Sequence, residues 1–352
     1  MSKPKVLHVR RDISNRPLKR WLWGELRRLF FFYDQEGYFD ASLHEAFERI
    51  TAMTAESALI KKESIAQNFD IVVVNTKSVH DEEETKQQKL HELGNLTTTS
   101  VLVETSANAY QMPSDYACNA YDIIFRREHL QDTSQYDLSE ENQRKLCITM
   151  LPCLQIPLPK NRFSKILEPL FIPQATKLDN PEKKHDVFFC GNVAESKSDR
   201  IQAVKALVEA DDIDFYGGLQ PKYQSVDIPE KLQADRMSPD VYANALQRSR
   251  VVLALDGIGQ FTFRHLETWY FGGFLLSSPS IRDVSIPMPA KEGEHFVAFD
   301  NTDDLVKKVR HFVDQQQKRE DIAATGKQMF KNNYDPQKHG EYISSQIERI
   351  YE

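Results

Sequence analysis

Arg264 and Glu267 are spaced so that they could bind a nucleotide diphosphate and its ribose. They lie three residues apart, and a helix would place them on one face. Just before them, Gly257 and Gly259 allow the backbone to approach a ligand closely. A helix that begins here offers free N–H groups to an anion, with a cation beside them. The pattern therefore indicates an anion site, although an ion pair on a solvated helix would show the same spacing.

The same glycines also begin the sequence of a dinucleotide-binding loop. Gly257-Ile258-Gly259 matches the start of Gly-x-Gly-x-x-Gly, but Thr262 stands where the third glycine belongs. The tip of the next strand carries Ser277-Ser278, where such folds place an acid that binds ribose. We therefore disfavour a nicotinamide or flavin site.

These candidate residues require a strand before them and another after them. Val251 to Leu255 is an uninterrupted apolar run, as in a parallel strand that is buried on both faces. Thr262 is a suitable N-cap for the helix that follows, and Gly272-Gly273 ends that helix. Phe274 to Leu276 then begins the next strand. The stretch predicts strand, glycine loop, helix, glycine turn and strand.

Strands alternate with helices along the rest of the chain, which indicates parallel α/β domains. In the first part we predict a helical region at 41–67, a solvated helix or loop at 80–93, and strands at 6–9, 70–75, 100–104 and 121–125. In the second part we predict strands at 187–190, 213–216 and 295–299, and helices that begin at 198, 238, 302 and about 337.

Residues 155–184 differ in character, since five prolines break any regular element there and a charged run ends the stretch. This is the best candidate for a domain connection. We therefore divide the chain into an N-terminal α/β domain at 1–155, a linker at 156–184 and a second α/β domain at 185–335. A C-terminal helix at 336–352 could cross back to the first domain.

Composition narrows the class of protein. A length of 352 residues favours two domains, and a net charge of −7 does not favour a general nucleic-acid binder. The four cysteines form no CxxC pair, which indicates a reducing compartment without disulfides or structural zinc. The sequence shows no signal peptide and no apolar run of membrane-spanning length. We expect a cytoplasmic protein.

Residues 16–33 form an unusual segment in which five basic residues alternate with aromatic and aliphatic ones. Such a segment could contact an anionic membrane or an acidic glycan. The simpler interpretation, which we favour, is a helix of the first domain with its aromatic side chains packed inward. Peripheral contact with a membrane stays open.

Several short motifs follow one another in the second domain. Phe189-x-Gly191 ends a strand, Arg200 opens a helix, Tyr216-Gly217 ends the next strand, and Thr262-x-Arg264-x-x-Glu267 precedes Gly-Gly-Phe-Leu-Leu. A Lys-Arg-Glu-x-Ile-Ala-x-x-Gly segment follows at 318–326. This order resembles the donor-binding half of GT-B glycosyltransferases, closest to the family-1 and spore-maturation-protein-like group, with echoes of exostosin-like enzymes. The resemblance covers about residues 186–335 and implies an α/β protein of two Rossmann-like domains that face a cleft.

The resemblance also implies site residues, since a nucleotide-sugar lies mostly on the second domain in these families. Arg264 would contact the diphosphate, Glu267 the ribose hydroxyls, and Arg200 a phosphate. Gly257 and Gly259 would allow close approach of the donor, and Gly191 would face the cleft. Tyr216 would border the base, although a core tyrosine is as good an interpretation. Because two cations can neutralise the leaving diphosphate, we expect no metal requirement and no cofactor beyond the nucleotide-sugar.

A base beside the acceptor would serve an inverting transfer to a hydroxyl. Asp12 and Glu104 qualify by position, because each follows a strand of the first domain at its carboxyl end. Either could instead be a surface or capping acid. Asp212-Ile213-Asp214 matches the metal-binding pattern of GT-A enzymes, but it precedes a strand and is interpreted as an acidic turn.

We therefore predict a glycosyltransferase that moves a sugar from a nucleotide-sugar to a glycan or lipid-linked acceptor in surface polysaccharide synthesis. Two alternatives stay open. One is a nucleotide-sugar epimerase-like enzyme of similar architecture. The other is a non-catalytic module that binds a glycan or a partner through residues 16–33.

Overall fold

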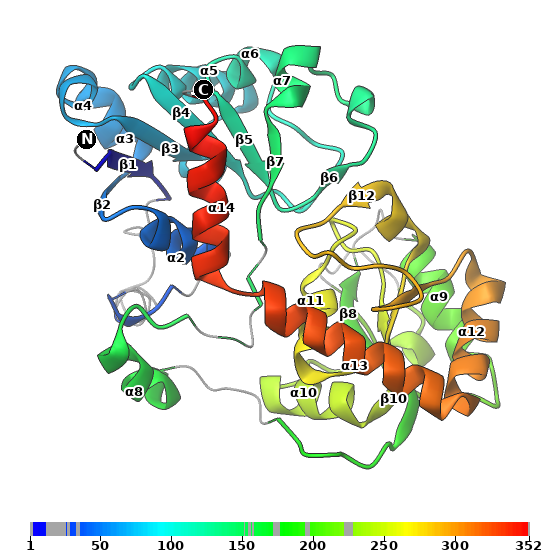
Figure 1. Ribbon diagram of the computed structural model, residues 1–352. Helices are drawn as coiled ribbons and strands as arrows, with labels where there is room; N and C mark the ends of the chain where they lie inside the picture. The colour runs from blue at the N-terminus through cyan, green and yellow to red at the C-terminus, as the bar shows by residue number, and fades with distance from the viewer. Residues whose placement is uncertain are drawn as a thin grey trace.

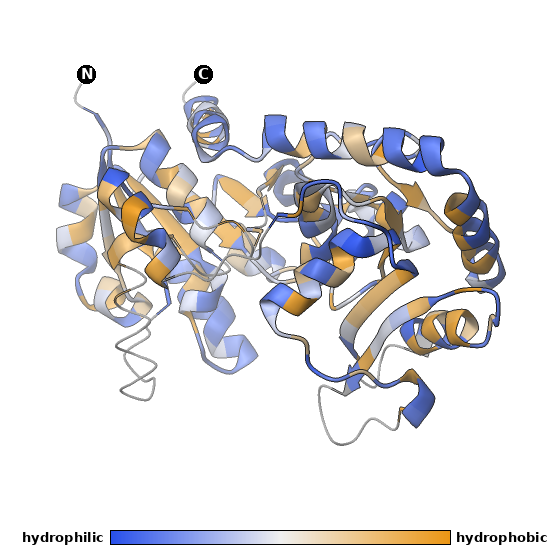
Figure 2. Cartoon of the chain, turned by 90° about the horizontal axis from the view of Figure 1, so that it is seen from below, coloured by the Kyte–Doolittle hydropathy of each residue, from blue (hydrophilic) through white to orange (hydrophobic). Residues whose placement is uncertain are grey.

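Two parallel sheets, each covered by helices, make up the protein (Figure 1). The computed structural model describes residues 3–11, 26, 29–32, 36–150, 152–153, 156, 158–171, 177–193, 198–221 and 228–350. Figure 2 shows why the layers form, because the strands are hydrophobic whereas the covering helices carry many hydrophilic residues. Burial of apolar strand faces under amphipathic helices is the main force that assembles such layers.

The first sheet has six strands in the order β2-β1-β3-β4-β5-β7, all parallel to their neighbours. Its strands are β1 (Lys5–Val9), β2 (Arg49–Met53), β3 (Ile71–Asn75), β4 (Thr99–Glu104), β5 (Ile123–Arg126) and β7 (Leu146–Ile148). The helices of this part are α2 (Gly37–Ala46), α3 (Ala55–Ile60), α4 (Lys62–Asn68), α5 (Glu83–Gly94), α6 (Asp115–Cys118) and α7 (Glu140–Arg144). The four predicted strands of this part are confirmed.

The predicted helical region at 41–67 is partly wrong, because it contains β2. This strand lies at the edge of the sheet and pairs with β1, and most of its residues are exposed or half-buried. An edge strand with so little burial carries no apolar run, so the sequence pattern did not reveal it.

The second sheet has five strands in the order β13-β11-β10-β8-β9. Its strands are β8 (His185–Val193), β9 (Phe215–Pro221), β10 (Ser249–Ala254), β11 (Leu275–Ser277) and β13 (Val297–Ala298). Around it lie α9 (Ser198–Val208), α10 (Pro239–Arg248), α11 (Phe263–Phe271), α12 (Thr302–Asp314) and α13 (Gln316–Asn333). One boundary was predicted wrongly: Gly217 and Gly218 do not close a strand but lie inside β9, with φ of 110° and 147°. Glycine allows the strand to continue through these angles.

Two helices lie outside these layers. The proline-rich stretch was predicted to lack regular structure, but it contains α8 (Arg162–Phe171), with Pro169 inside the helix. Helix α14 (Pro336–Glu348) returns to the first sheet and packs along α2 (Figure 1). There Ile343 and Ile347 join the hydrophobic cluster of the first sheet.

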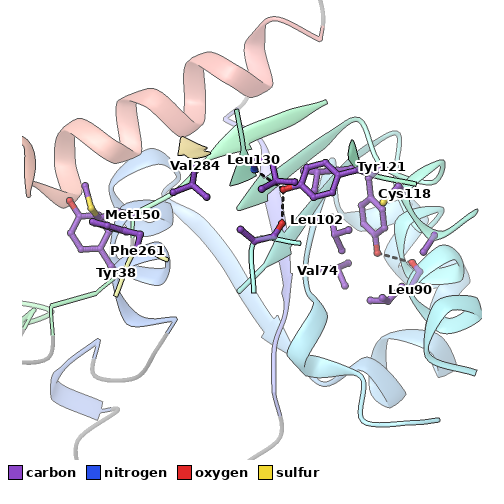
Figure 3. Packing of buried hydrophobic residues seen from close by; sticks show 14 of the residues in the cluster. Tyr38, Val74, Leu90, Leu102, Cys118, Tyr121, Leu130, Met150, Phe261 and Val284 are labelled. Carbon is purple, nitrogen blue, oxygen red and sulfur yellow. Dashed lines mark hydrogen bonds between the residues drawn. The ribbon is translucent and has the colours of Figure 1, made fainter. Parts of the chain in front are cut away.

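A shared hydrophobic core and a small sheet connect the two halves. Phe261 from the second half belongs to the same buried cluster as Tyr38 and Met150 from the first (Figure 3). Strand β12 (Val284–Ser285) pairs antiparallel with β6 (His129–Leu130). The second half therefore packs directly on the carboxyl end of β5.

Within the described ranges, no helix combines the length and the hydropathy that crossing a membrane would require.

Candidate functional site

Arg200 and Arg264 converge on one aromatic ring in the second sheet. Arg264, in the first turn of α11, donates a hydrogen bond to the carbonyl oxygen of Cys190, and its guanidinium carbon lies 4.7 Å from the ring centroid of Phe189. Arg200, near the start of α9, donates to the carbonyl oxygen of Leu255 at 3.0 Å and lies 5.4 Å from the same centroid. Both cations thus sit at the carboxyl ends of β8 and β10, where parallel sheets bind ligands.

The two guanidinium groups are close enough to affect one another. Burial, together with the positive charge of Arg264, lowers the pKa of Arg200 to about 10, so Arg200 remains protonated at pH 7. Among the described residues, Nε of Arg200 and Nη1 of Arg264 are buried and have no hydrogen-bond partner. Buried donors without acceptors are rare in proteins, and phosphate oxygens are the acceptors that two adjacent guanidinium groups suit best.

The start of α11 is built as the sequence predicted. Thr262 is the N-cap, and the backbone N–H of Thr262 donates to Nδ1 of His265 at 3.1 Å, so the two residues form a capping box. Burial lowers the pKa of His265 to about 3, so the ring is neutral and its Nε2–H donates to Oγ of Ser277 at 2.9 Å. His265 therefore acts as a cap. Gly272, with φ of 73°, ends the helix as predicted.

Glu267 lies in the interior beside Arg264. It is buried, and its Oε2 accepts a hydrogen bond of 2.8 Å from the hydroxyl of Tyr242. Burial raises the pKa of Glu267, while the Tyr242 hydrogen bond and the charge of Arg264 oppose the rise. The alternative interpretation, an ion pair on a solvated helix face, is therefore wrong.

The three candidate glycines have different surroundings. A Cβ atom on Gly257 would lie 3.4 Å from Nη2 of Arg200, and one on Gly191 would lie 3.6 Å from Nη1, so both glycines border the arginine pair. Gly259 faces the first domain instead. A Cβ atom there would lie 1.7 Å from the carbonyl oxygen of Ala107, so glycine at this position allows the two halves to meet.

Tyr216 is not brought to the arginine pair. Its ring stacks on His185, with centroids 4.3 Å apart, at the start of β8. The two rings line a cavity of about 320 Å³ together with α10, including Val241 and Arg248. This cavity lies at the amino ends of β8 and β9, whereas the arginines lie at the carboxyl ends of β8 and β10. The structure therefore gives Tyr216 no contact that would support its predicted place beside a base.

Of the two acids predicted as catalytic bases, only Glu104 lies within the described residues. Asp12 lies outside the described residues. Glu104 ends β4, is buried, and accepts a hydrogen bond of 2.5 Å from the backbone N–H of Ser106. Burial lowers the pKa values of Lys77 and Arg127, and the negative charge of Glu104 opposes this lowering. The role of either acid as a base stays a prediction.

Glu128 is an acid that the sequence reasoning missed. It follows β5, is fully buried, and its Oε2 accepts a hydrogen bond of 2.6 Å from the backbone N–H of Phe261, directly before α11. Its Oε1 accepts from Nη2 of Arg127 at 3.2 Å, and burial raises the pKa of Glu128. The signal for it was present, because the charged run Arg126-Arg127-Glu128 begins at the last residue of a buried strand of the first sheet.

The two aspartates of the Asp-x-Asp pattern make surface contacts with basic side chains. Asp212 accepts two hydrogen bonds of 2.7 Å from Arg310, and Asp214 contacts Nδ1 of His185 at 3.0 Å. Across the described ranges, no group of three or more histidine, cysteine, aspartate or glutamate side chains is arranged to hold a metal ion. The four cysteines form no disulfide with one another.

A comparison with family models finds a match in the second half of the chain. Residues 199–344 match the model described as "Glycosyl transferase-like". This part of the chain is similar to that family. It contains Arg200, Arg264 and Glu267, and it confirms the predicted class of enzyme. A comparison with curated protein sequences finds no match.

Solved structures share the fold over the whole chain. The Anabaena protein HepE in complex with UDP and glucose has a TM-score of 0.56 at 10% identity, over 98% of this chain and 100% of that one. A glycosyltransferase from Rickettsia africae has a TM-score of 0.56 at 11% identity, over 100% of both chains. A DNA-modifying β-glucosyltransferase has a TM-score of 0.51 at 8% identity, over 98% of this chain and 99% of that one. The predicted GT-B fold is confirmed.

Proposed function

We propose that this glycosyltransferase takes its sugar from a uridine diphosphate donor and transfers it to a hydroxyl group of a glycan or lipid-linked acceptor. The observation that carries the proposal is the pair of guanidinium groups on Phe189, each with a buried donor that has no partner among the described residues. HepE, which shares the fold, is described in complex with UDP-glucose, and this supports the choice of uridine.

The diphosphate would lie between Arg200 and Arg264. Gly191 and Gly257 border these arginines, and they leave room where larger residues would cover the guanidinium groups. Glu267 would bind the ribose hydroxyls through the oxygen that does not accept from Tyr242. This arrangement binds the donor through charge-assisted hydrogen bonds, each of which contributes about 1.5–3 kcal/mol.

The transfer step needs few protein groups. The acceptor oxygen forms a bond to the anomeric carbon, and the bond from that carbon to the diphosphate oxygen breaks. The electron pair leaves with the nucleoside diphosphate, whose added charge the two arginines would stabilise. The acceptor proton goes to a base, for which Asp12 and Glu104 remain candidates, and Glu128 joins them by its place against the loop before α11. We propose no metal and no further cofactor.

The acceptor and the place of action are parts of the same proposal. A glycan or lipid-linked acceptor suits a role in surface polysaccharide synthesis, in the cytoplasm. Residues 16–33 combine basic and aromatic side chains and would allow peripheral contact with an anionic membrane.

The test is a comparison of donors with the purified chain. UDP-, GDP-, CMP- and dTDP-linked sugars are compared by isothermal titration, and we expect the uridine compounds to bind best. The bound donor is then followed by NMR, first alone and then with lipid-linked and glycan acceptors. Release of UDP with a new glycosidic bond supports the proposal. A changed sugar that remains attached to UDP in the absence of acceptor would instead indicate an epimerase-like enzyme.

A further inference from the structure

Helix α8 exposes large apolar side chains. Phe163, Ile166 and Leu170 are 60%, 75% and 75% exposed, and their spacing of three and four residues places them on one side of the helix. Leu29, which is 64% exposed, is a further large apolar residue in this region. We call these four residues the α8 surface. In Figure 1, α8 lies at the edge of the molecule, away from both sheets.

Backbone contacts join the two parts of this surface. The N–H of Phe32 donates to the carbonyl oxygen of Leu158, and the N–H of Lys160 donates to that of Phe30, both at 3.0 Å. The ring of Phe30 lies 6.0 Å from that of Phe163. Residues 29–32 therefore form one continuous structure with the stretch that leads into α8. Asn161 begins the helix, because its Oδ1 accepts from the N–H of Ser164 at 2.8 Å.

The charge of this region is opposite to that of the chain as a whole. The described residues 29–32 and 158–171 contain three lysine and arginine residues against one glutamate, a net charge of +2 in a chain of net charge −7. On α8 itself, Arg162 and Lys165 lie to one side of the apolar face, since successive helix residues are rotated by about 100°. A second copy of the chain would bring a like charge to this surface, whereas an anionic lipid headgroup complements it.

We propose that the α8 surface docks on an anionic lipid membrane. Helix α8 would lie in the plane of the interface. Phe163, Ile166 and Leu170 would insert between the lipid headgroups, and the basic residues would lie on the aqueous side. A short helix with one apolar face and flanking cations is the structure that binds this way, and it enters the membrane without crossing it. This inference deepens the proposed membrane contact by adding a described element to residues 16–33. It depends on exposure and charge, and on no feature of the arginine pair.

The test is flotation of the full-length protein with vesicles, without donor or acceptor. Vesicles of phosphatidylcholine alone are compared with vesicles that contain about one third phosphatidylglycerol. We expect binding to the anionic vesicles that weakens with salt, and a loss of at least about tenfold in Ile166→Asp/Leu170→Asp. The matched control is Ile60→Asp, because Ile60 is 83% exposed on α3 of the first domain and its replacement should leave binding unchanged.

A second variant reverses charge and keeps the apolar face. Lys160→Glu/Arg162→Glu should also lose binding to anionic vesicles, and it serves if the double aspartate variant does not fold. Wild-type protein that fails to float with anionic vesicles at low salt would overturn the proposal, as would variants that bind like Ile60→Asp. Sedimentation velocity provides the last check: a dimer that both α8 variants convert to monomer would assign the surface to contact between copies. UDP titration of the same variants should be unchanged, so a failure here leaves the donor proposal intact.

Discussion

Replacement of Arg264 by alanine should abolish most donor binding while it leaves the unliganded fold nearly as stable as before. In the folded protein the side chain donates one hydrogen bond to Cys190 and lies over Phe189. The loss of such contacts costs about 0.5–1.5 kcal/mol. The change also removes a positive charge that lowers the pKa of Arg200, and relief of this repulsion is a gain of the same order. We therefore expect a net change in the free energy of unfolding within about 1 kcal/mol.

The effect on UDP binding should be much larger. One lost charge-assisted contact weakens binding by roughly ten- to a hundredfold. At a UDP concentration of about one hundred times the wild-type dissociation constant, bound ligand adds about 2.7 kcal/mol of stability. A hundredfold weaker site adds only about 0.4 kcal/mol at the same concentration. For a domain of this size the ligand-induced rise in Tm should fall from roughly 5–10 °C to about 1 °C.

The assay is a thermal-shift titration with UDP, supported by calorimetry of the same proteins. Arg310→Ala is the matched control, since Arg310 is an exposed arginine of the same domain whose ion pair with Asp212 lies on the surface. We expect it to retain the full shift. The reasoning is refuted if Arg264→Ala binds UDP within twofold of the wild type. A loss of more than about 3 kcal/mol in the unliganded protein would instead make Arg264 a structural residue.

Three further predictions concern the contact between domains and the dependence on pH. Gly259→Ala should lower Tm and open the two halves in X-ray scattering, because its Cβ atom would lie 1.7 Å from a carbonyl oxygen of the first domain. Gly293→Ala strains its own turn, where φ is 82°, but its Cβ atom meets nothing within 4 Å, so it controls for destabilisation without opening. Equal scattering from both variants would contradict this prediction. Glu128→Ala removes the carboxylate partner of the buried Arg127 and the acceptor of the Phe261 N–H, so urea unfolding should show a loss of about 3 kcal/mol or more in the free energy of unfolding. A neutral effect would argue against a stabilising role of the contact between Glu128 and Phe261. Burial lowers the pKa of His339 to about 4, below its ordinary value. Between these two pKa values the folded state therefore binds fewer protons than the unfolded state. The stability that the neutral ring gives is lost as pH falls from about 6.5 towards 4. Between pH 7 and 4 the wild type should therefore lose about 3 kcal/mol more than His339→Gln, and parallel pH profiles would refute the assignment.

Local sequence patterns determined the framework of the donor half. The apolar run at Val251 to Leu255 became β10 because both of its faces are buried, and Thr262 and Gly272 mark the bounds of α11 because their backbone geometry suits helix ends. The helical spacing of Arg264 and Glu267 followed from the same residues. These features depend on neighbours a few positions away, and the sequence shows such neighbours directly.

Some elements depend on packing that a local pattern does not show. Strand β2 has no apolar run and exists because it pairs with β1. Helix α8 tolerates Pro169 within its span. Tyr216 fits a motif, but its side chain stacks on His185 at the start of β8. For β2 the partner strand decided the outcome, and for Tyr216 the direction of its side chain did, and composition encodes neither.

Only the tertiary structure brought the site residues together. Arg200 and Arg264 are distant in sequence, and they meet because β8 and β10 are neighbours in the sheet and present their carboxyl ends side by side. Glu128 reaches the N–H of Phe261 across the boundary between the two sheets. The sequence by itself determined which residues could bind an anion, because that follows from their chemistry and local spacing. The order of the strands and the docking of the domains decided which of them meet, because those contacts are non-local.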